Sequence, residues 1–387
     1  MPPGSSLPMP DEAALRHSAR VVAAVHEDIA RAGGFIPLSR YLELVLYAPA
    51  LGYYVAGSRK FGPDGDFVTG PELTPLYGFA MARQLETVLA RTGTSDIVEL
   101  GAGSGALAAA VLTALAQRGA LPSRYRILEV SPELRARQRS SIAAVAAASK
   151  VRIEWLDRLP PSIDGVLLMN EVLDAIAPCV IARRHGEWFE RGVIAERDGL
   201  RLAERTLDDA RIRALAAARF PVGIDYVSEI NPAAEALVAT IARRVGTGAL
   251  LVIDYGFTRR EYYHAQRSEG TLVGHYRHHV HADPLLWPGL SDLTAHVDFT
   301  AMADAAERAG LRIAGFATQA SFLLGCGLLD LLANVGATDS LAYLRTASAV
   351  QTLVSPAEMG DLFKVLLVAR SEADIPSLAL TDISDRL

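Results

Sequence analysis

Apolar positions recur with a helical period in the first part of the chain. Their spacing predicts amphipathic helices over residues 12–32, 37–46 and 75–92. Between the second and third of these helices lies a long segment rich in Gly, Pro and Tyr, YAPALGYYVAGSRKFGPDGDFVTGPE. Loops of this length are usually functional or disordered, and the aromatic content argues against disorder.

From residue 96 onward, short apolar runs alternate with helical patterns. The runs predict strands over residues 96–100, 125–130, 151–155, 165–170 and 248–256. Alternation of strands and helices is typical of a parallel sheet covered on both faces, which predicts an α/β fold. The chain then closes with a helix (residues 299–309), a strand (312–318), a helical segment (321–349) and a last strand (362–369). The last strand could pair antiparallel beside the strand at 312–318.

Two segments interrupt the alternation. Residues 178–206 alternate apolar and polar positions around HGE and RDG, which predicts an antiparallel insertion. Residues 258–295 form a second insertion that is polar and rich in His. We therefore expect a disordered tail (residues 1–12), an N-terminal helical segment with a lid loop (13–92), a core that carries both insertions (93–370) and a C-terminal tail (371–387).

Composition limits the class of protein. The chain has 387 residues, of which 50% are hydrophobic and 21% charged, so it is long enough for one large domain or two. The net charge of −6 gives no basic footprint for nucleic acid. Two cysteines, Cys179 and Cys326, are too few for a disulfide framework. Apolar runs are too short for a membrane span, no secretory signal opens the chain, and Arg and Ala dominate, so we expect a cytoplasmic bacterial protein.

Three glycines follow the strand predicted over residues 96–100. In the segment VELGAGSGALA, Gly101, Gly103 and Gly105 would let the backbone approach a ligand closely at the N-terminus of the next helix. A dinucleotide, S-adenosylmethionine (SAM) or no ligand at all would be compatible with such a turn. Glu99 favours SAM, because its carboxylate would attract the ammonium of a methionine group and repel a pyrophosphate.

Further polar side chains follow the next predicted strands. Glu129 could accept both ribose hydroxyls of either cofactor. Asp157 could accept an adenine amino group or be a solvated loop acid. Asn170, Glu171 and Asp174 lie beside the crevice in which open α/β sheets bind ligands. The alternative for these three is a helix N-terminus, where Asn and acidic residues are also favoured.

The last third of the chain adds weaker candidates. Asp254 and Tyr255 end a predicted strand and could shape a substrate pocket. His296 and Asp298, in LTAHVDF, could form an orienting pair, or Asp298 could simply cap a helix. The four histidines of residues 275–281 match no common zinc spacing, so we expect no metal site there and leave open a solvated or substrate-facing loop.

Several of these segments form an ordered set. GDFVTGPE, VELGAGSGALA, LEVSPELRARQ, NEVLDAI, VIDYG and DLTAHVDF together resemble the SAM-dependent methyltransferases that include mitochondrial complex I assembly factor 7 and its bacterial relatives, from about residue 34 to 370. The resemblance implies a class I, Rossmann-like core whose seven-stranded sheet has an antiparallel last strand. It also implies methyl transfer to a protein, with arginine as the acceptor in that family. Ala102 and Ala106 depart from the family's Gly-Pro-Gly-x-Gly-Thr turn, which puts one threonine contact in doubt.

Transfer to arginine needs groups that orient a charged, planar guanidinium and take up the released proton. Our candidates for these roles are the carboxylates of Glu72, Glu171 and Asp174, with His296 as an orienting group. No metal is required for this chemistry.

The segment GDFVTGPE would form a lid over the cofactor. Asp66 would order this loop, and Thr69 and Pro71 would belong to it. Without the resemblance, Asp66 and Glu72 would be assigned to turn and N-cap roles. Two other functions stay open: an assembly factor that binds SAM without catalysis, and an NAD-dependent oxidoreductase. Neither the acceptor protein nor the oligomeric state is predicted.

Overall fold

The computed structural model of the protein describes residues 7–55, 69–197, 199–370 and 374–387, and Asp66 of the predicted lid lies outside them. Contacts divide the chain into two compact units. The core unit comprises Thr69–Asp174, Ala234–Arg259 and Val297–Leu387. The N-terminal unit comprises Met1–Val68, Ala175–Ala233 and Arg260–His296. The second unit therefore gathers both insertions and the N-terminal helices, a grouping that the sequence pattern did not predict.

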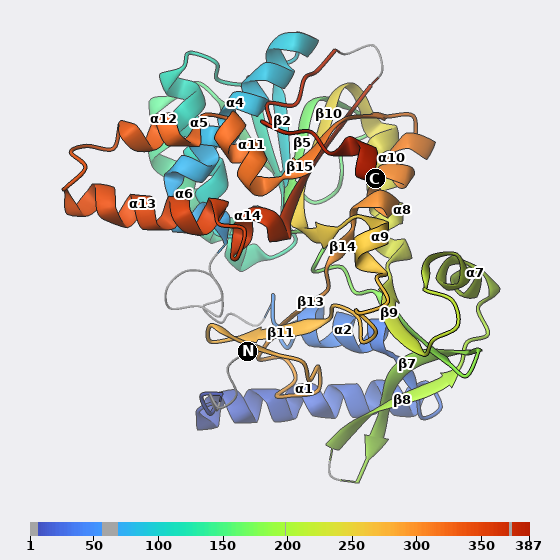
Figure 1. Cartoon of the computed structure of the whole chain (residues 1–387). Helices are drawn as coiled ribbons and strands as arrows, with labels where there is room; N and C mark the ends of the chain where they lie inside the picture. Colours follow the sequence, from blue (N-terminus) through green and yellow to red (C-terminus); the bar gives the residue numbers. More distant parts are fainter. Residues whose placement is uncertain (1–6, 56–68, 198, 371–373) are drawn as a thin grey trace. The chain divides into compact units, whose positions relative to one another are not determined.

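The core unit is built on a mostly parallel sheet (Figure 1). The strands on its path follow the order β15-β16-β10-β5-β2-β3-β4, and a short β14 pairs with β10. Strand β16 runs antiparallel to both β10 and β15, which confirms the Rossmann-like fold with an antiparallel last strand. The strands are β2 (Asp96–Leu100), β3 (Arg124–Leu128), β4 (Arg152–Leu156), β5 (Ile163–Asn170), β10 (Val245–Phe257), β14 (Val297–Asp298), β15 (Arg312–Thr318) and β16 (Phe363–Ala369).

Helices cover both faces of this sheet, with α4, α5 and α11 on one side and α8 and α10 on the other (Figure 1). Helix α4 begins where the Thr74 hydroxyl accepts a hydrogen bond from Leu76 N (3.3 Å), and it ends at Gly93 in the left-handed conformation. The helices are α3 (Gly70–Leu73), α4 (Pro75–Thr92), α5 (Ala106–Gln117), α6 (Pro132–Ala148), α8 (Pro232–Arg244), α10 (Phe299–Arg308), α11 (Gln319–Gly325), α12 (Leu328–Ala333), α13 (Leu341–Val354) and α14 (Met359–Leu362).

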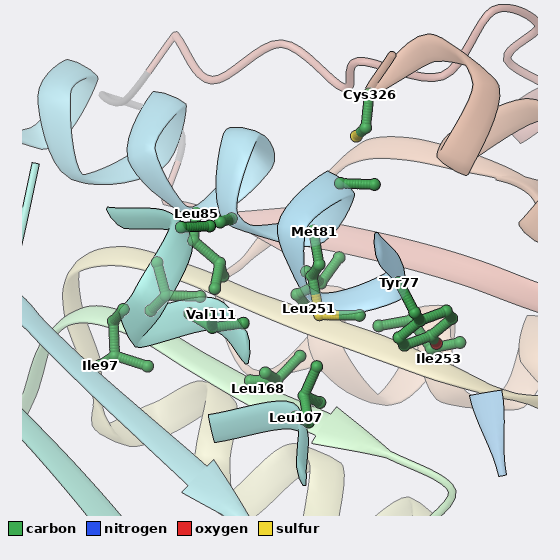
Figure 2. Packing of buried hydrophobic residues seen from close by; sticks show 14 of the residues in the cluster. Tyr77, Met81, Leu85, Ile97, Leu107, Val111, Leu168, Leu251, Ile253 and Cys326 are labelled. Carbon is green, nitrogen blue, oxygen red and sulfur yellow. The ribbon is translucent and has the colours of Figure 1, made fainter. Parts of the chain in front are cut away.

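The hydrophobic core lies between α4, α5 and the sheet. Figure 2 shows Met81 and Leu85 of α4 packed near Val111 of α5, with Leu168 and Leu251 supplied by the two central strands. All five side chains are fully buried. Burial of this kind fixes the strand ends, and therefore the positions of the polar residues that follow each strand.

Residues 374–387, within the predicted C-terminal tail, pack on the core unit. Ile375 is buried, and Gln84 of α4 donates to Pro376 O (3.0 Å) and accepts from Leu378 N (2.8 Å). Ile383 N donates to Phe316 O (2.8 Å), just before a short 3₁₀ helix, η1 (Ser384–Arg386). These contacts hold residues 374–387 against the core unit.

The N-terminal unit contains an antiparallel sheet of order β1-β7-β6-β9, with β8 paired to β7. Residues 178–206 supply β6, β7 and β8, as their alternating pattern predicted. Strand β9 and helix α7 were not predicted. The strands are β1 (Ile36–Pro37), β6 (Cys179–Arg184), β7 (Glu187–Glu196), β8 (Gly199–Thr206) and β9 (Tyr226–Ile230).

Helices and a small second sheet complete the N-terminal unit. Asp11 caps its first helix by accepting from Ala14 N (2.8 Å), and Val21, Val25 and Ile29 form the buried face of that helix. In the part of the chain that the structure describes, no helix is both long and apolar enough to span a bilayer. The remaining elements are α1 (Glu12–Arg31), α2 (Leu38–Tyr47), α7 (Ala210–Arg219), α9 (Arg259–Tyr262), β11 (Val273–Tyr276), β12 (His279–His281) and β13 (Asp292–Thr294).

Candidate functional site

The glycine turn joins β2 to α5 in the core unit. Gly101, Gly103 and Gly105 all have positive φ, at 64°, 53° and 84°. This left-handed conformation suits glycine and strains other residues. A Cβ on Gly101 would also lie 3.2 Å from Val172 Cγ2, and one on Gly105 would lie 3.0 Å from Gln138 Cα. The structure therefore needs glycine at this turn.

Glu99 lies in β2 just before the turn, and its residue is only 2% exposed. The Tyr125 hydroxyl, on neighbouring β3, donates to Glu99 Oε2 at 2.6 Å. Burial raises the pKa of Glu99 to about 7, although the hydrogen bond from Tyr125 opposes this shift. Among the described residues, Tyr125 is the one hydrogen-bond partner of this carboxylate. A carboxylate can accept several hydrogen bonds, so Glu99 keeps capacity for a cationic ligand group.

Glu129 follows β3 and is also buried. Its Oε1 accepts from Ser131 N (2.9 Å), and its Oε2 accepts from Gln138 Nε2 (3.0 Å). Gln138 Nε2 donates in addition to the carbonyl of Gly103 (3.0 Å), so this amide joins the carboxylate to the glycine turn. Both oxygens of Glu129 are thereby held in place with lone pairs to spare for two hydroxyl donors.

Asp157 follows β4 and forms an ion pair with Arg135 of α6 (2.7 Å). Its side chain is 87% exposed. Arg135 donates as well to the carbonyls of Glu129 (2.7 Å) and Leu156 (2.8 Å), and so ties the ends of two strands to α6. Asp157 is thus an exposed loop acid paired with Arg135, and its contact with an adenine amino group stays a prediction.

A chain of hydrogen bonds leads to the carboxylate of Glu171. The buried Tyr77 hydroxyl of α4 donates to Asn170 Oδ1 (2.6 Å), and Asn170 Nδ2 donates to Glu171 Oε1 (2.9 Å). Burial and the nearby charges of Glu171 and Asp254 raise the pKa of Tyr77 well above its usual value, so this phenol stays a donor. Glu171 has φ = 55°, a rare conformation for a non-glycine residue and one that clusters at functional sites.

The segment after β5 is held by Asp254 of β10. Asp254 Oδ2 accepts from the backbone N–H groups of Val172, Leu173 and Asp174 at 3.2, 2.9 and 3.4 Å. Its Oδ1 accepts from Tyr255 N (2.9 Å). Because Asp254 is fully buried and its oxygens serve the backbone, the expected pocket-shaping role is corrected to an internal structural one. No helix begins at residues 170–174, so the helix N-terminus alternative was also wrong.

Part of the predicted lid is described. Thr69 is the N-cap residue of α3, and its carbonyl accepts from Glu72 N (3.0 Å). Pro71 occupies the first turn of this short helix. The Ser104 hydroxyl, inside the glycine turn, donates to Glu72 Oε1. The structure therefore brings Glu72 to the glycine turn, and Thr69 rather than Glu72 has the N-cap position.

His296 belongs to the N-terminal unit, where its backbone N–H donates to Thr271 Oγ1 (3.0 Å). Its orienting role stays a prediction. Asp298 accepts from Ala301 N (3.0 Å) and caps α10, as one of the two alternatives held. In the His-rich segment, His281 Nε2 bonds to Ser291 Oγ (3.0 Å). Within the described ranges no group of three His, Cys, Asp or Glu side chains could hold a metal ion.

Sequence reasoning missed the residues that orient these acids, namely Tyr77, Ser104, Arg135 and Gln138. Gln138 left a weak signal, because it precedes the buried Ile142 by one helical turn and so places an amide on the apolar face of α6. Tyr77 left none, since a tyrosine in the first turn of a buried helix is an ordinary core residue.

The donors and acceptors around β2 and β3 suit one kind of ligand. Two buried carboxylates can take an ammonium and a pair of adjacent hydroxyls, while the glycine turn exposes backbone to the same ligand. A pyrophosphate would meet the carboxylate of Glu99. These residues therefore fit an adenosyl amino acid better than a dinucleotide.

Comparisons with known proteins agree. The family model of S-adenosyl-L-methionine-dependent methyltransferases matches residues 80–317. The chain is 30% identical to "Protein arginine methyltransferase NDUFAF7 homolog, mitochondrial" of Caenorhabditis elegans, over 70% of this chain and 68% of that protein. It is 26% identical to the NDUFAF7 protein of Homo sapiens, over 85% and 79% of the two chains.

A solved structure is also similar. The crystal structure of a Burkholderia thailandensis protein bound to S-adenosyl-homocysteine superposes with a TM-score of 0.94 at 45% sequence identity, covering 99% of this chain and 100% of that one. The family match and the curated relatives confirm the resemblance drawn from the sequence segments. The chain belongs to the family of S-adenosyl-L-methionine-dependent methyltransferases.

Proposed function

We propose that this protein transfers the methyl group of SAM to an arginine side chain of a protein acceptor. The observation that carries the proposal is the hydrogen-bond chain from Tyr77 through Asn170 to Glu171. It orients a carboxylate directly after β5, the strand next to β2 and the glycine turn. The names of the curated relatives, which are protein arginine methyltransferases, support the same acceptor.

The cofactor would be held by the ends of β2 and β3. Glu99 would accept from the ammonium group of the cofactor, and Glu129 would accept from its two ribose hydroxyls. The glycine turn would contact the part of the cofactor that joins these two groups. Val130 directly follows Glu129 and is 80% exposed, so an adenine ring beside it would cover an apolar side chain. When bound, SAM supplies an activated methyl group, and the protein has to bind and orient the two reactants.

Glu171 would orient the acceptor. A guanidinium stays protonated in water and pairs with carboxylates in a planar geometry, so a carboxylate whose position is fixed can direct one nitrogen at the methyl group. That nitrogen forms a bond to the methyl carbon as the sulfur–methyl bond breaks, and it then loses a proton to a carboxylate or to water. Asp174 and Glu72 are the further candidates, and Glu72 lies at the glycine turn through Ser104.

The competing function is a protein that binds SAM and methylates nothing. Glu171→Gln separates the two, because it keeps the size and the bond from Asn170 but removes the charge. Purified protein is incubated with SAM carrying a tritiated methyl group and with extract of source cells from which the gene has been deleted.

We expect label in protein, recovered as methylarginine after acid hydrolysis. Glu171→Gln should reduce this label by about a hundredfold or more while binding S-adenosylhomocysteine (SAH) normally. Label in another amino acid would overturn the arginine acceptor. No protein label with either form, despite normal SAH binding, would favour the scaffold.

A further inference from the structure

Gln138 of α6 forms hydrogen bonds with both amino hydrogens and with the oxygen of its side-chain amide. The residue is 0% exposed. Its two amide hydrogens go to the carbonyl of Gly103 and to Glu129 Oε2, both at 3.0 Å. Its carbonyl Oε1 accepts from the indole N–H of Trp155 on β4 at 2.9 Å. Three contacts therefore account for both donors and the acceptor of the group.

These contacts permit one orientation of the amide. The Trp155 indole nitrogen can only donate, so it has to face the oxygen of Gln138. The carbonyl of Gly103 can only accept, and so can Glu129 when ionised. Rotating the amide by half a turn would set donor against donor at Trp155 and oxygen against oxygen at the other two positions.

A second buried glutamine in the same unit shows what a purely structural amide looks like. Gln84 of α4 is also 0% exposed, and it bonds to the backbone of Pro376 and Leu378. It reaches no residue of the glycine turn and no carboxylate of the candidate site. Gln138 differs because both of its donors end on the turn and on the proposed ribose acceptor.

We infer that Gln138 is a positioning residue for the adenosine half of the cofactor. Its amide fixes the carboxylate of Glu129 relative to the glycine turn, and Trp155 fixes the amide. This inference rests on the proposed role of Glu129 in holding the ribose hydroxyls. It assigns the residue no contact with the methionine half of the ligand.

Calorimetric titration with two ligands tests the inference. SAH carries the whole adenosyl amino acid, and 5′-methylthioadenosine keeps the adenine and ribose but lacks the ammonium and carboxylate. Gln138→Leu should raise the Kd of both ligands by the same factor, about ten- to thirtyfold, the effect of losing a hydrogen bond to a charged group. The matched variant Gln84→Leu should lower the thermal midpoint without changing either Kd.

Two more variants show whether a negative result argues against the proposed position of the ribose or against the role of Gln138. Glu129→Gln should weaken both ligands, and adding Gln138→Leu to it should cost less than the two single effects combined, because both act on one contact. If Glu129→Gln leaves 5′-methylthioadenosine binding unchanged, the placement of the ribose is wrong. If it weakens binding and Gln138→Leu does not, the inference alone fails.

Gln138→Met covers the case in which the leucine variant does not fold. Its unbranched side chain is close to glutamine in length and uncharged, but it offers no donor to Gly103 or Glu129. A folded Gln138→Met protein with unchanged Kd for 5′-methylthioadenosine would overturn the inference, and a weakened Kd would support it.

Discussion

Glu99 and Asp254 are two buried carboxyl groups of the core unit with similar surroundings and different partners. Burial raises the pKa of each to about 7. Asp254 accepts four backbone N–H groups, three of them from residues 172–174. Glu99 accepts one hydroxyl, from Tyr125.

The difference separates an acid whose hydrogen bonds serve the fold from one that we propose binds a ligand. The hydrogen-bonding capacity of Asp254 is used inside the protein, where it fixes the segment that follows β5. Glu99 accepts one hydrogen bond and keeps acceptor capacity that we propose the ammonium of a ligand uses. Both residues lie near the carboxyl end of a strand, so they differ in the hydrogen bonds that each accepts and not in their position.

The largest expected effect is on stability at Asp254. Asp254→Ala should lower the free energy of unfolding by about 3 kcal/mol, because several buried N–H groups lose their acceptor. Urea unfolding monitored by tryptophan fluorescence measures this change. Glu99→Gln, which can still accept from Tyr125, should cost about 1 kcal/mol or less. A larger loss for Glu99→Gln than for Asp254→Ala would reverse the comparison.

We propose that the glycine turn, like Glu99, contacts the ligand. Gly103→Val should weaken SAH binding by about a hundredfold or more, since a branched side chain at φ = 53° strains the turn and fills the space that a ligand needs. Gly93 ends α4 with φ = 65°, and a Cβ added there would have nothing within 4 Å, so Gly93→Val is a matched control. It should reduce stability and leave the Kd of SAH unchanged. Equal affinity in both variants would contradict the placement of the cofactor.

The shifted pKa of Glu99 predicts a pH dependence of binding. Below about pH 7 the free protein carries a neutral Glu99, which has to lose its proton to pair with the ligand's ammonium. The Kd of SAH should therefore rise by up to about tenfold per pH unit below 7 and level off above it. Calorimetry between about pH 5.5 and pH 8, all in about 0.15 M salt, measures the slope. The same slope in Glu99→Gln would assign it to another group.

The smallest effect is expected at Asp157. An exposed ion pair contributes about 0–1 kcal/mol, so Asp157→Asn should change the Kd of SAH by about threefold or less. A much larger change, measured by the same titration, would support the predicted contact between Asp157 and the ligand.

The sequence predicted most of the core unit because buried parallel strands are continuous apolar runs with the polar residues at their ends. Glu99, Glu129 and Asn170 were selected in this way, and their cofactor roles stay predictions. It could not predict the N-terminal unit as a whole, since β9 pairs with β6 across an intervening pair of strands and a helix, and β1 is only two residues long. Local periodicity carries no information on such distant pairing.

The site was predicted less completely than the fold. A strand-end acid can be recognised from its position, but the direction of its side chain cannot. That is why Asp254 was assigned to a pocket when its carboxylate serves the backbone. The orienting groups Tyr77 and Gln138 come from helices that reach the site only after packing, so their roles appear only in three dimensions.

The central claim is that the end of β2 binds the amino acid half of the cofactor through Glu99, and that the end of β3 binds its adenosine half. Titration of wild-type protein and Glu99→Gln with SAH and with 5′-methylthioadenosine tests this claim most directly. We predict that the variant binds SAH about thirtyfold more weakly and 5′-methylthioadenosine as well as the wild type does. Unchanged SAH affinity, or an equal loss for both ligands, would contradict the account.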